Sequence, residues 1–168
     1  MKKRFFLLLL PGLWACSAGV LEIDTIDFNQ ESIQVCGNPS TATEVLFKLK
    51  GPETLILELQ PGLLLNEASS DTLTSAVPGQ SQLIYRLLSD QATTGYFCDP
   101  IPPVSPTVVE EILAADGTVQ VFTTRNPSDT TQFEHTIRLK GISFVNDSGE
   151  RLTNLEVDEF GTLVTTAN

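Results

Sequence analysis

Alternation of apolar and polar residues is the main signal along this chain, and it predicts β-strands. The clearest example is the segment 44–60, in which apolar residues alternate with charged or polar ones on both sides of a Gly51-Pro52 turn. Its apolar set is Val45, Phe47, Leu49, Leu55, Leu57 and Leu59. A period of two over such lengths is typical of half-buried strands. The segment therefore predicts an antiparallel hairpin with one buried and one wet face.

Shorter β-prone runs flank this hairpin. Segments 31–36, 81–89 and 93–98 each predict a strand, whereas 66–80 is rich in Ser, Thr, Asp and Gly and predicts a loop with at most one short strand. Segment 99–106 contains four prolines in seven residues, which excludes a regular element. We expect the chain to cross between two sheets there.

Two interpretations remain open for the segment 107–125. In the first, Ser105-Pro106 begins a helix that ends at Gly117. The apolar side of this helix would consist of Val109, Ile112 and Leu113. Alternatively, Asp116-Gly117 is the turn of a β-hairpin. The β-branched residues on both sides of this dipeptide favour the hairpin.

The C-terminal third predicts a long strand whose phase changes. Phe133, Ile137 and Leu139 are in step, whereas Ile142 is one residue out, which indicates a β-bulge near Lys140-Gly141. A turn at 146–150 and strands at 151–157 and 161–166 complete the chain. The predicted fold is all-β: a two-sheet antiparallel β-sandwich, immunoglobulin-like in general architecture, with nine or ten strands and little helix.

The N-terminus has the layout of a secretory signal. Lys2, Lys3 and Arg4 precede the run FFLLLL, and residues 1–15 contain no acid. Because Pro11 and Gly12 interrupt the run, it is shorter than the roughly 20 apolar residues of a membrane span. We expect residues 1–15 to be a lipoprotein signal peptide, 16–30 a lipidated N-terminus with a tether or edge strand, and 31–168 a single β-sandwich domain.

Cys16 ends a tetrapeptide, Leu13-Trp14-Ala15-Cys16, that resembles a bacterial lipobox. Trp14 departs from that pattern, in which the position is usually small or β-branched. The resemblance implies cleavage before Cys16 and a diacylglycerol on its sulfur. The alternatives are ordinary cleavage near Ala18 and an uncleaved cytosolic chain.

Cys36 and Cys98 are the two remaining cysteines, an even number that suits an oxidising compartment. Each follows a β-prone run and precedes a proline-containing turn, so the pair predicts a disulfide between two strand ends at one rim. Closing a loop of this length stabilises the fold by about 4 kcal/mol in the chain-entropy model. A pair of buried free thiols is the alternative.

Charge excludes some partners. The whole chain has a net charge of −11; without residues 1–15 it has seven basic and 21 acidic residues, a net charge of −14. Such a surface repels nucleic acid and anionic lipid headgroups. We therefore predict no nucleic-acid partner, and membrane attachment through the N-terminal lipid.

Candidate catalytic groups are few. His135 is the chain's only histidine, and alternation places it on the apolar face of its strand, which favours a hydrogen-bonded, half-buried role over catalysis or metal binding. No common nucleophile, metalloprotease or nucleotide motif occurs. The sequence thus predicts no catalytic residue, no metal site and no cofactor.

Two pairs of adjacent acidic residues and one turn contain side chains of the types found in catalytic or metal sites. Glu110-Glu111 and Asp158-Glu159 are adjacent acids that point to opposite faces of a strand, so each pair is interpreted as solvated. The turn at 146–150 carries oxygen ligands of the kind that calcium takes, namely Asn146, Asp147 and Glu150, but its spacing matches no EF-hand and favours a plain turn. Exposed Trp or Tyr platforms for sugars are scarce, because Tyr85 and Tyr96 both fall in predicted strands.

The whole chain resembles uncharacterised envelope lipoproteins of the Bacteroidota. The resemblance lies in the leader ending at Cys16, the Cys36-Gly37 pair, and the stretches 45–57, 118–150 and 160–163. It implies an envelope-anchored β-domain with no assigned activity. We expect lipid anchoring in the cell envelope, at the outer membrane with the face undetermined, and a non-enzymatic interaction or accessory module that binds an envelope protein or polymer. The alternative is a protein that binds or hydrolyses glycans.

Overall fold

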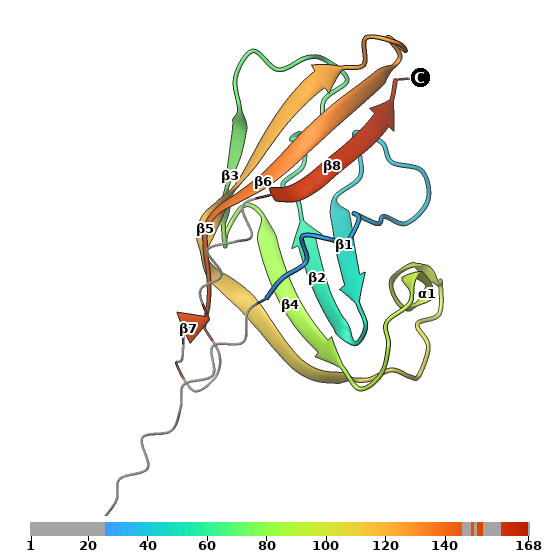
Figure 1. Ribbon diagram of the computed structural model, residues 1–168, viewed down its shortest axis with the longest axis vertical. Coiled ribbons are helices and arrows are strands. Elements are labelled where there is room, and N and C mark those ends of the chain that lie inside the picture. Colours follow the sequence, from blue (N-terminus) through green and yellow to red (C-terminus); the bar gives the residue numbers. More distant parts are fainter. Residues whose placement is uncertain (1–25, 146–148, 150, 153–158, 168) are drawn as a thin grey trace, which may run out of the picture.

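The computed structural model describes residues 26–145, 149, 151–152 and 159–167 (Figure 1). Strands dominate, there is one short helix, and every strand pair is antiparallel, so the predicted all-β class with little helix is confirmed. The elements are β1 (Val45–Lys50), β2 (Glu53–Glu58), β3 (Leu73–Val77), β4 (Gln82–Leu88), α1 (Thr94–Cys98), β5 (Val108–Arg125), β6 (Gln132–Val145), β7 (Arg151–Leu152) and β8 (Glu159–Thr166).

All described strands belong to one curled sheet. Its order is β1-β2-β4-β5-β6-β7, with β3 added on β5 and β8 on β6. The long β5 pairs with β4 near its start and with β3 and β6 further on. We call β1, β2, β4 and the start of β5 the lower half, and β3, the rest of β5, β6 and β8 the upper half (Figure 1). Two separate sheets with nine or ten strands are not confirmed, because the described chain forms eight hydrogen-bonded strands in one sheet.

Segment 107–125 is neither a helix nor a hairpin but the single strand β5. Its pairing with β6 shifts register between Ala114 and Thr118, so Asp116-Gly117 forms an irregular bend in the strand instead of a turn. Gly117 has a φ of 137°, and a Cβ there would lie 3.0 Å from Ile142 Cα. A glycine lets β5 bend at this point and continue into the upper half. The predicted bulge at Gly141 of β6 is confirmed by a φ of 65° and by the register step beside it.

The hairpin predicted at 44–60 is confirmed as β1 and β2, but the prediction that one of its faces is exposed to solvent is wrong. Leu46 points into the main core, whereas Phe47 on the opposite face packs with Ile56 and Ile84 in a second apolar cluster. Lys48, expected in solvent, is buried at 3% exposure. The hairpin is buried on both sides because α1 covers its outer face.

Segment 93–98 forms helix α1, not the predicted strand. The Phe97 ring stacks on the Phe47 ring with centroids 4.5 Å apart, and Cys98 forms the predicted disulfide with Cys36. The disulfide joins a helix end to a bend, so the expected tie between two strand ends is wrong. Segment 31–36 contributes only an isolated bridge between Gln34 and Phe47.

The segment 26–34 lies between the edges β1 and β8 of the curled sheet. Ile26 and Phe28 are buried in the main core, Ile33 approaches the backbone of β8 at Gly161, and the Lys48 ammonium donates to the Phe28 carbonyl at 2.9 Å. Residues 26–30, predicted as tether or edge strand, are therefore packed against the sheet without forming a strand.

The remaining elements agree with the patterns. β3 is the short strand expected within 66–80, β4 and β8 lie where alternation placed them, and 99–106 has no regular structure. Within the described ranges, no helix has the length and apolar composition needed to cross a membrane.

Candidate functional site

His135 is fully buried in the upper half, and both of its ring nitrogens are bonded. Nδ1 lies 2.8 Å from Thr123 Oγ1, and Nε2 lies 2.8 Å from Thr165 Oγ1. Because Thr165 donates its own proton to Asn66 Oδ1, it accepts from Nε2–H, and Thr123 donates to Nδ1. Burial lowers the pKa of His135 to about 4. The predicted structural role is confirmed, and the burial is deeper than expected.

Lys48 is a buried charge that the alternation pattern missed. Its ammonium bonds the Phe28 carbonyl and lies 5.4 Å from the centroid of the Phe160 ring. Burial lowers the pKa of Lys48, while the nearby Glu31 and Glu159 carboxylates partly oppose that shift. A cleft of about 540 Å³ opens beside these groups. The lysine fixes segment 26–34 to β1, which gives it a structural role.

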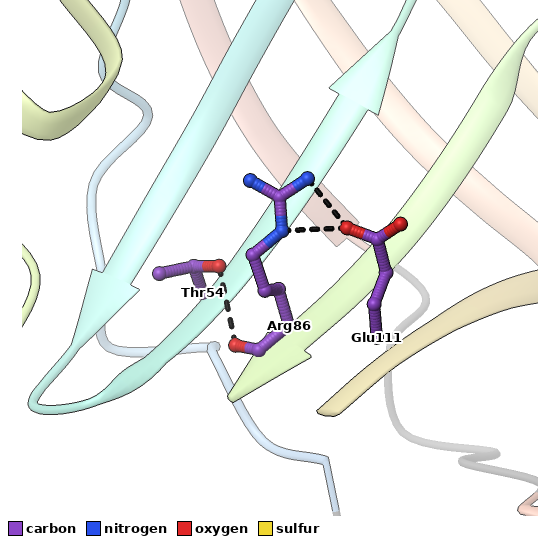
Figure 2. A network of polar contacts seen from close by, with 3 residues as sticks. All are labelled: Thr54, Arg86 and Glu111. Atoms are coloured by element: carbon purple, nitrogen blue, oxygen red, sulfur yellow. Dashed lines mark hydrogen bonds and ion pairs between the residues drawn. The ribbon is translucent and has the colours of Figure 1, made fainter. Parts of the chain in front are cut away.

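The pair Glu110-Glu111 does not converge on a site, whereas Glu159, whose neighbour Asp158 lies outside the described residues, lines the cleft beside Lys48 together with Glu31. Glu111 accepts a hydrogen bond of 2.7 Å from Arg86 Nε across the β4–β5 pair, while Thr54 Oγ1 donates to the Arg86 carbonyl at 3.2 Å (Figure 2). Glu110 is exposed. Glu111 is therefore part of a solvent-facing ion pair, the kind that contributes little to stability.

Several candidate groups lie outside the described residues. They are Cys16, Asn146, Asp147, Glu150 and Asp158. Among the residues that the structure does describe, no group of three or more His, Cys, Asp or Glu side chains is arranged to hold a metal ion.

The outer face of the upper half is open and rich in hydroxyl groups. We call this surface the threonine face; it consists of Thr72, Thr74, Thr118, Gln120, Phe122, Thr124, Glu134, Thr136, Arg138, Lys140, Thr162, Val164 and Thr166. The inward residues between them form the main core, so the two sides of these strands differ in the way typical of antiparallel sheets.

A cavity of about 340 Å³ lies on the threonine face, within the range of small-molecule sites. Its lining consists of Thr72, Gln120, Phe122, Thr136 and Arg138. Register places Phe122 opposite Thr136, and Gln120 opposite Arg138, on neighbouring strands. Phe122 is 39% exposed although it is a large apolar ring. The lining of the cavity thus combines a partly exposed aromatic ring with hydroxyl, amide and guanidinium groups.

Phe122 was missed at the sequence level because the search for a platform considered Trp and Tyr. Tyr85 instead donates to Glu53 at 2.7 Å, and Tyr96 packs edge-on against Phe97 of α1. The available signal was the alternation of Thr118, Gln120, Phe122 and Thr124 with buried residues, which is unusually uncharged for the wet face of a strand in an acidic chain.

The comparisons with known proteins leave this geometry as the basis for function. No family model matches the chain, and neither a characterised protein nor a solved structure is significantly similar to it.

Proposed function

We propose that this chain is an envelope-anchored lipoprotein that serves as a non-enzymatic binding module, with the threonine face as its binding surface. The observation that carries the proposal is the partly exposed Phe122 ring in the wall of an open cavity on the sheet. The buried ionisable side chains, in contrast, are engaged internally: His135 by two threonines and Lys48 by a backbone carbonyl.

Anchoring would occur through a lipid on Cys16, the last residue of the lipobox-like tetrapeptide. The Cys36–Cys98 disulfide supports a compartment outside the cytoplasm, because disulfides persist where the environment is oxidising. The acidic surface supports attachment by the lipid and not by electrostatic attraction to headgroups. We propose the outer membrane as the site of attachment, on either of its faces.

The alternative function, hydrolysis of glycans, has less support. Retaining and inverting glycosidases use two carboxyl groups on opposite sides of the scissile bond. The described lining of the cavity on the threonine face offers no carboxylate, and Glu111 is paired with Arg86 on the lower half. Binding of a polymer without cleavage is therefore the form of this alternative that the geometry favours.

Metabolic labelling tests the anchor. In a Gram-negative host with lipoprotein-processing enzymes, the wild-type chain should incorporate a palmitate analogue and sediment with membranes, whereas Cys16→Ala should do neither. Ile101→Ser is the matched control, because it changes an exposed side chain but leaves the lipobox and the disulfide intact, and it should keep the label. Equal labelling of wild type and Cys16→Ala would contradict the anchor.

A further inference from the structure

We infer that the threonine face binds an uncharged polysaccharide, with one sugar ring stacked on Phe122. This inference rests on the proposed function, since it names the ligand of the same surface. An aromatic ring has a negative face, which attracts the polarised C–H groups on the flat side of a pyranose. Phe122 is 39% exposed and lines a cavity of about 340 Å³, a volume that suits one or two sugar units.

The groups around Phe122 match the hydroxyls of a sugar. Thr72 and Thr136 lie in the cavity wall beside it, and a threonine hydroxyl both donates and accepts hydrogen bonds. Gln120 adds an amide with two donors and an acceptor. Threonine side chains are stiff at χ1 and the strands hold them in register, so little conformational entropy is lost when a ligand binds.

A protein partner fits this face less well. The centres of protein interfaces are enriched in Tyr, Trp, Phe, Met and Arg, and binding energy concentrates in a few such residues. The threonine face has one aromatic ring and one arginine, and hydroxyl groups occupy most of its other positions. An array of short, polar side chains suits a ligand that is itself covered with hydroxyls.

Charge selects an uncharged glycan over an acidic one. The chain carries a net charge of −11, which repels polyanions, and Glu134 shares the threonine face with Arg138. Arg138 and the exposed Lys140 lie two residues apart on this face of β6, beside Glu134 and in an acidic chain, so they act as hydrogen-bond donors to sugar oxygens. Binding of an uncharged glycan should then be almost independent of salt.

Calorimetric titration of the full chain with its disulfide formed provides the test. The probes are neutral oligosaccharides (cello-, xylo-, manno- and malto-oligosaccharides), with polygalacturonate as the acidic comparison. At least one neutral probe should bind, and Phe122→Ala should weaken that binding by at least about tenfold, as expected for loss of a stacking contact. Val109→Ala is the matched control, because it removes an exposed apolar group from the start of β5, outside the threonine face and its cavity, and its affinity should stay within about twofold of wild type.

Salt dependence separates the two kinds of glycan. Raising ionic strength from about 0.1 M to about 1 M shortens the screening length from about 10 Å to about 3 Å. Affinity for the neutral probe should not change, whereas screening of the repulsion between the acidic chain and polygalacturonate should raise the weak affinity for that probe.

Three results would overturn the inference: no neutral probe binds, Phe122→Ala binds as well as wild type, or the acidic probe is preferred at low salt. In none of these cases is the anchor refuted, because the labelling of Cys16→Ala tests the proposed function separately. If no glycan binds but Phe122→Ala abolishes cross-linking of the anchored protein to an envelope protein, the face is a protein-binding surface and the glycan assignment is wrong.

Discussion

The two halves of the curled sheet share β5, yet their outer faces differ. In the lower half, Phe47, Ile56 and Ile84 form an apolar cluster on the outer face, and α1 covers it through the stacked ring of Phe97. In the upper half, the corresponding face is rich in threonine and lies open, with Phe122 exposed. One face is closed by the protein's own chain, whereas the other is available to a ligand.

The difference shows how one sheet serves two purposes. A sheet buried on both sides contributes to stability from both faces, and the lower half therefore acts as the stable base of the fold. The upper half obtains its stability from the residues of its inner face. The residues of its outer face are therefore not constrained by packing and can serve binding. The disulfide, the bend at Gly117 and the buried His135 each test one part of this comparison.

The largest effect is expected from removing the disulfide that holds α1 on the lower half. Replacing both Cys36 and Cys98 by serine should lower the free energy of unfolding by about 4 kcal/mol, because the unfolded chain regains the freedom of a long loop. Urea denaturation measures this loss. Hydrogen exchange should accelerate more in β1 and α1 than in β6, because the cover of the outer cluster loosens first.

The matched control for the disulfide is Ile101→Ser, in the connection that follows α1. Ile101 is 85% exposed, so its replacement should change stability by less than about 0.5 kcal/mol. Equal acceleration of exchange in both halves of the cysteine variant would show that α1 does not specifically protect the lower half.

A somewhat smaller effect is expected at the junction between the halves. Gly117→Ala should destabilise the protein by about 3 to 4 kcal/mol, since it combines an unfavourable φ of 137° with a clash against the Ile142 backbone. Gly141→Ala is the control: its φ is also positive, but no atom lies within 4 Å of the added Cβ, so a loss of about 1 kcal/mol is expected. Thermal denaturation compares the two. Equal losses would mean that close packing at the bend contributes nothing.

Local sequence patterns predicted the strands in which apolar and polar residues alternate regularly. They failed where contacts between distant segments determine the secondary structure. The hairpin at 44–60 follows from the alternation of apolar and polar residues with a period of two. The bulge at Gly141 follows from the change in phase of that alternation, which requires one extra residue in β6. Segment 93–98 also looks β-prone, but a five-residue helix forms there because Phe97 and Cys98 are fixed to partners distant in sequence. Nothing local to the segment encodes those partners.

The candidate site was harder to predict than the fold. Asp116-Gly117 has the composition of a hairpin turn, and it forms a bend only because β5 pairs with β4 near its start and with β3 and β6 further on. The cavity around Phe122 is formed by Thr72, directly before β3, and by residues of β5 and β6. Alternation within a single strand does not show which residues of neighbouring strands lie opposite one another. The buried role of His135 was predictable, because one strand supplies the pattern that places it inward.

The smallest effect concerns the polar layer inside the upper half. His135 has a pKa of about 4 in the folded protein and about 6.5 when unfolded, so the unfolded state binds more protons between these values. Its contribution to stability is complete above pH 6.5 and is lost as the pH falls toward 4, by about 3 kcal/mol. His135→Gln retains a donor and an acceptor for the threonines but does not titrate, so the wild-type loss of unfolding free energy between pH 7 and pH 4 should exceed that of the variant by this amount. Chemical denaturation at a series of pH values measures both curves. Parallel curves would mean that the imidazole is accessible to protons in the folded state, and that the inner layer of the upper half is as open to water as its outer face.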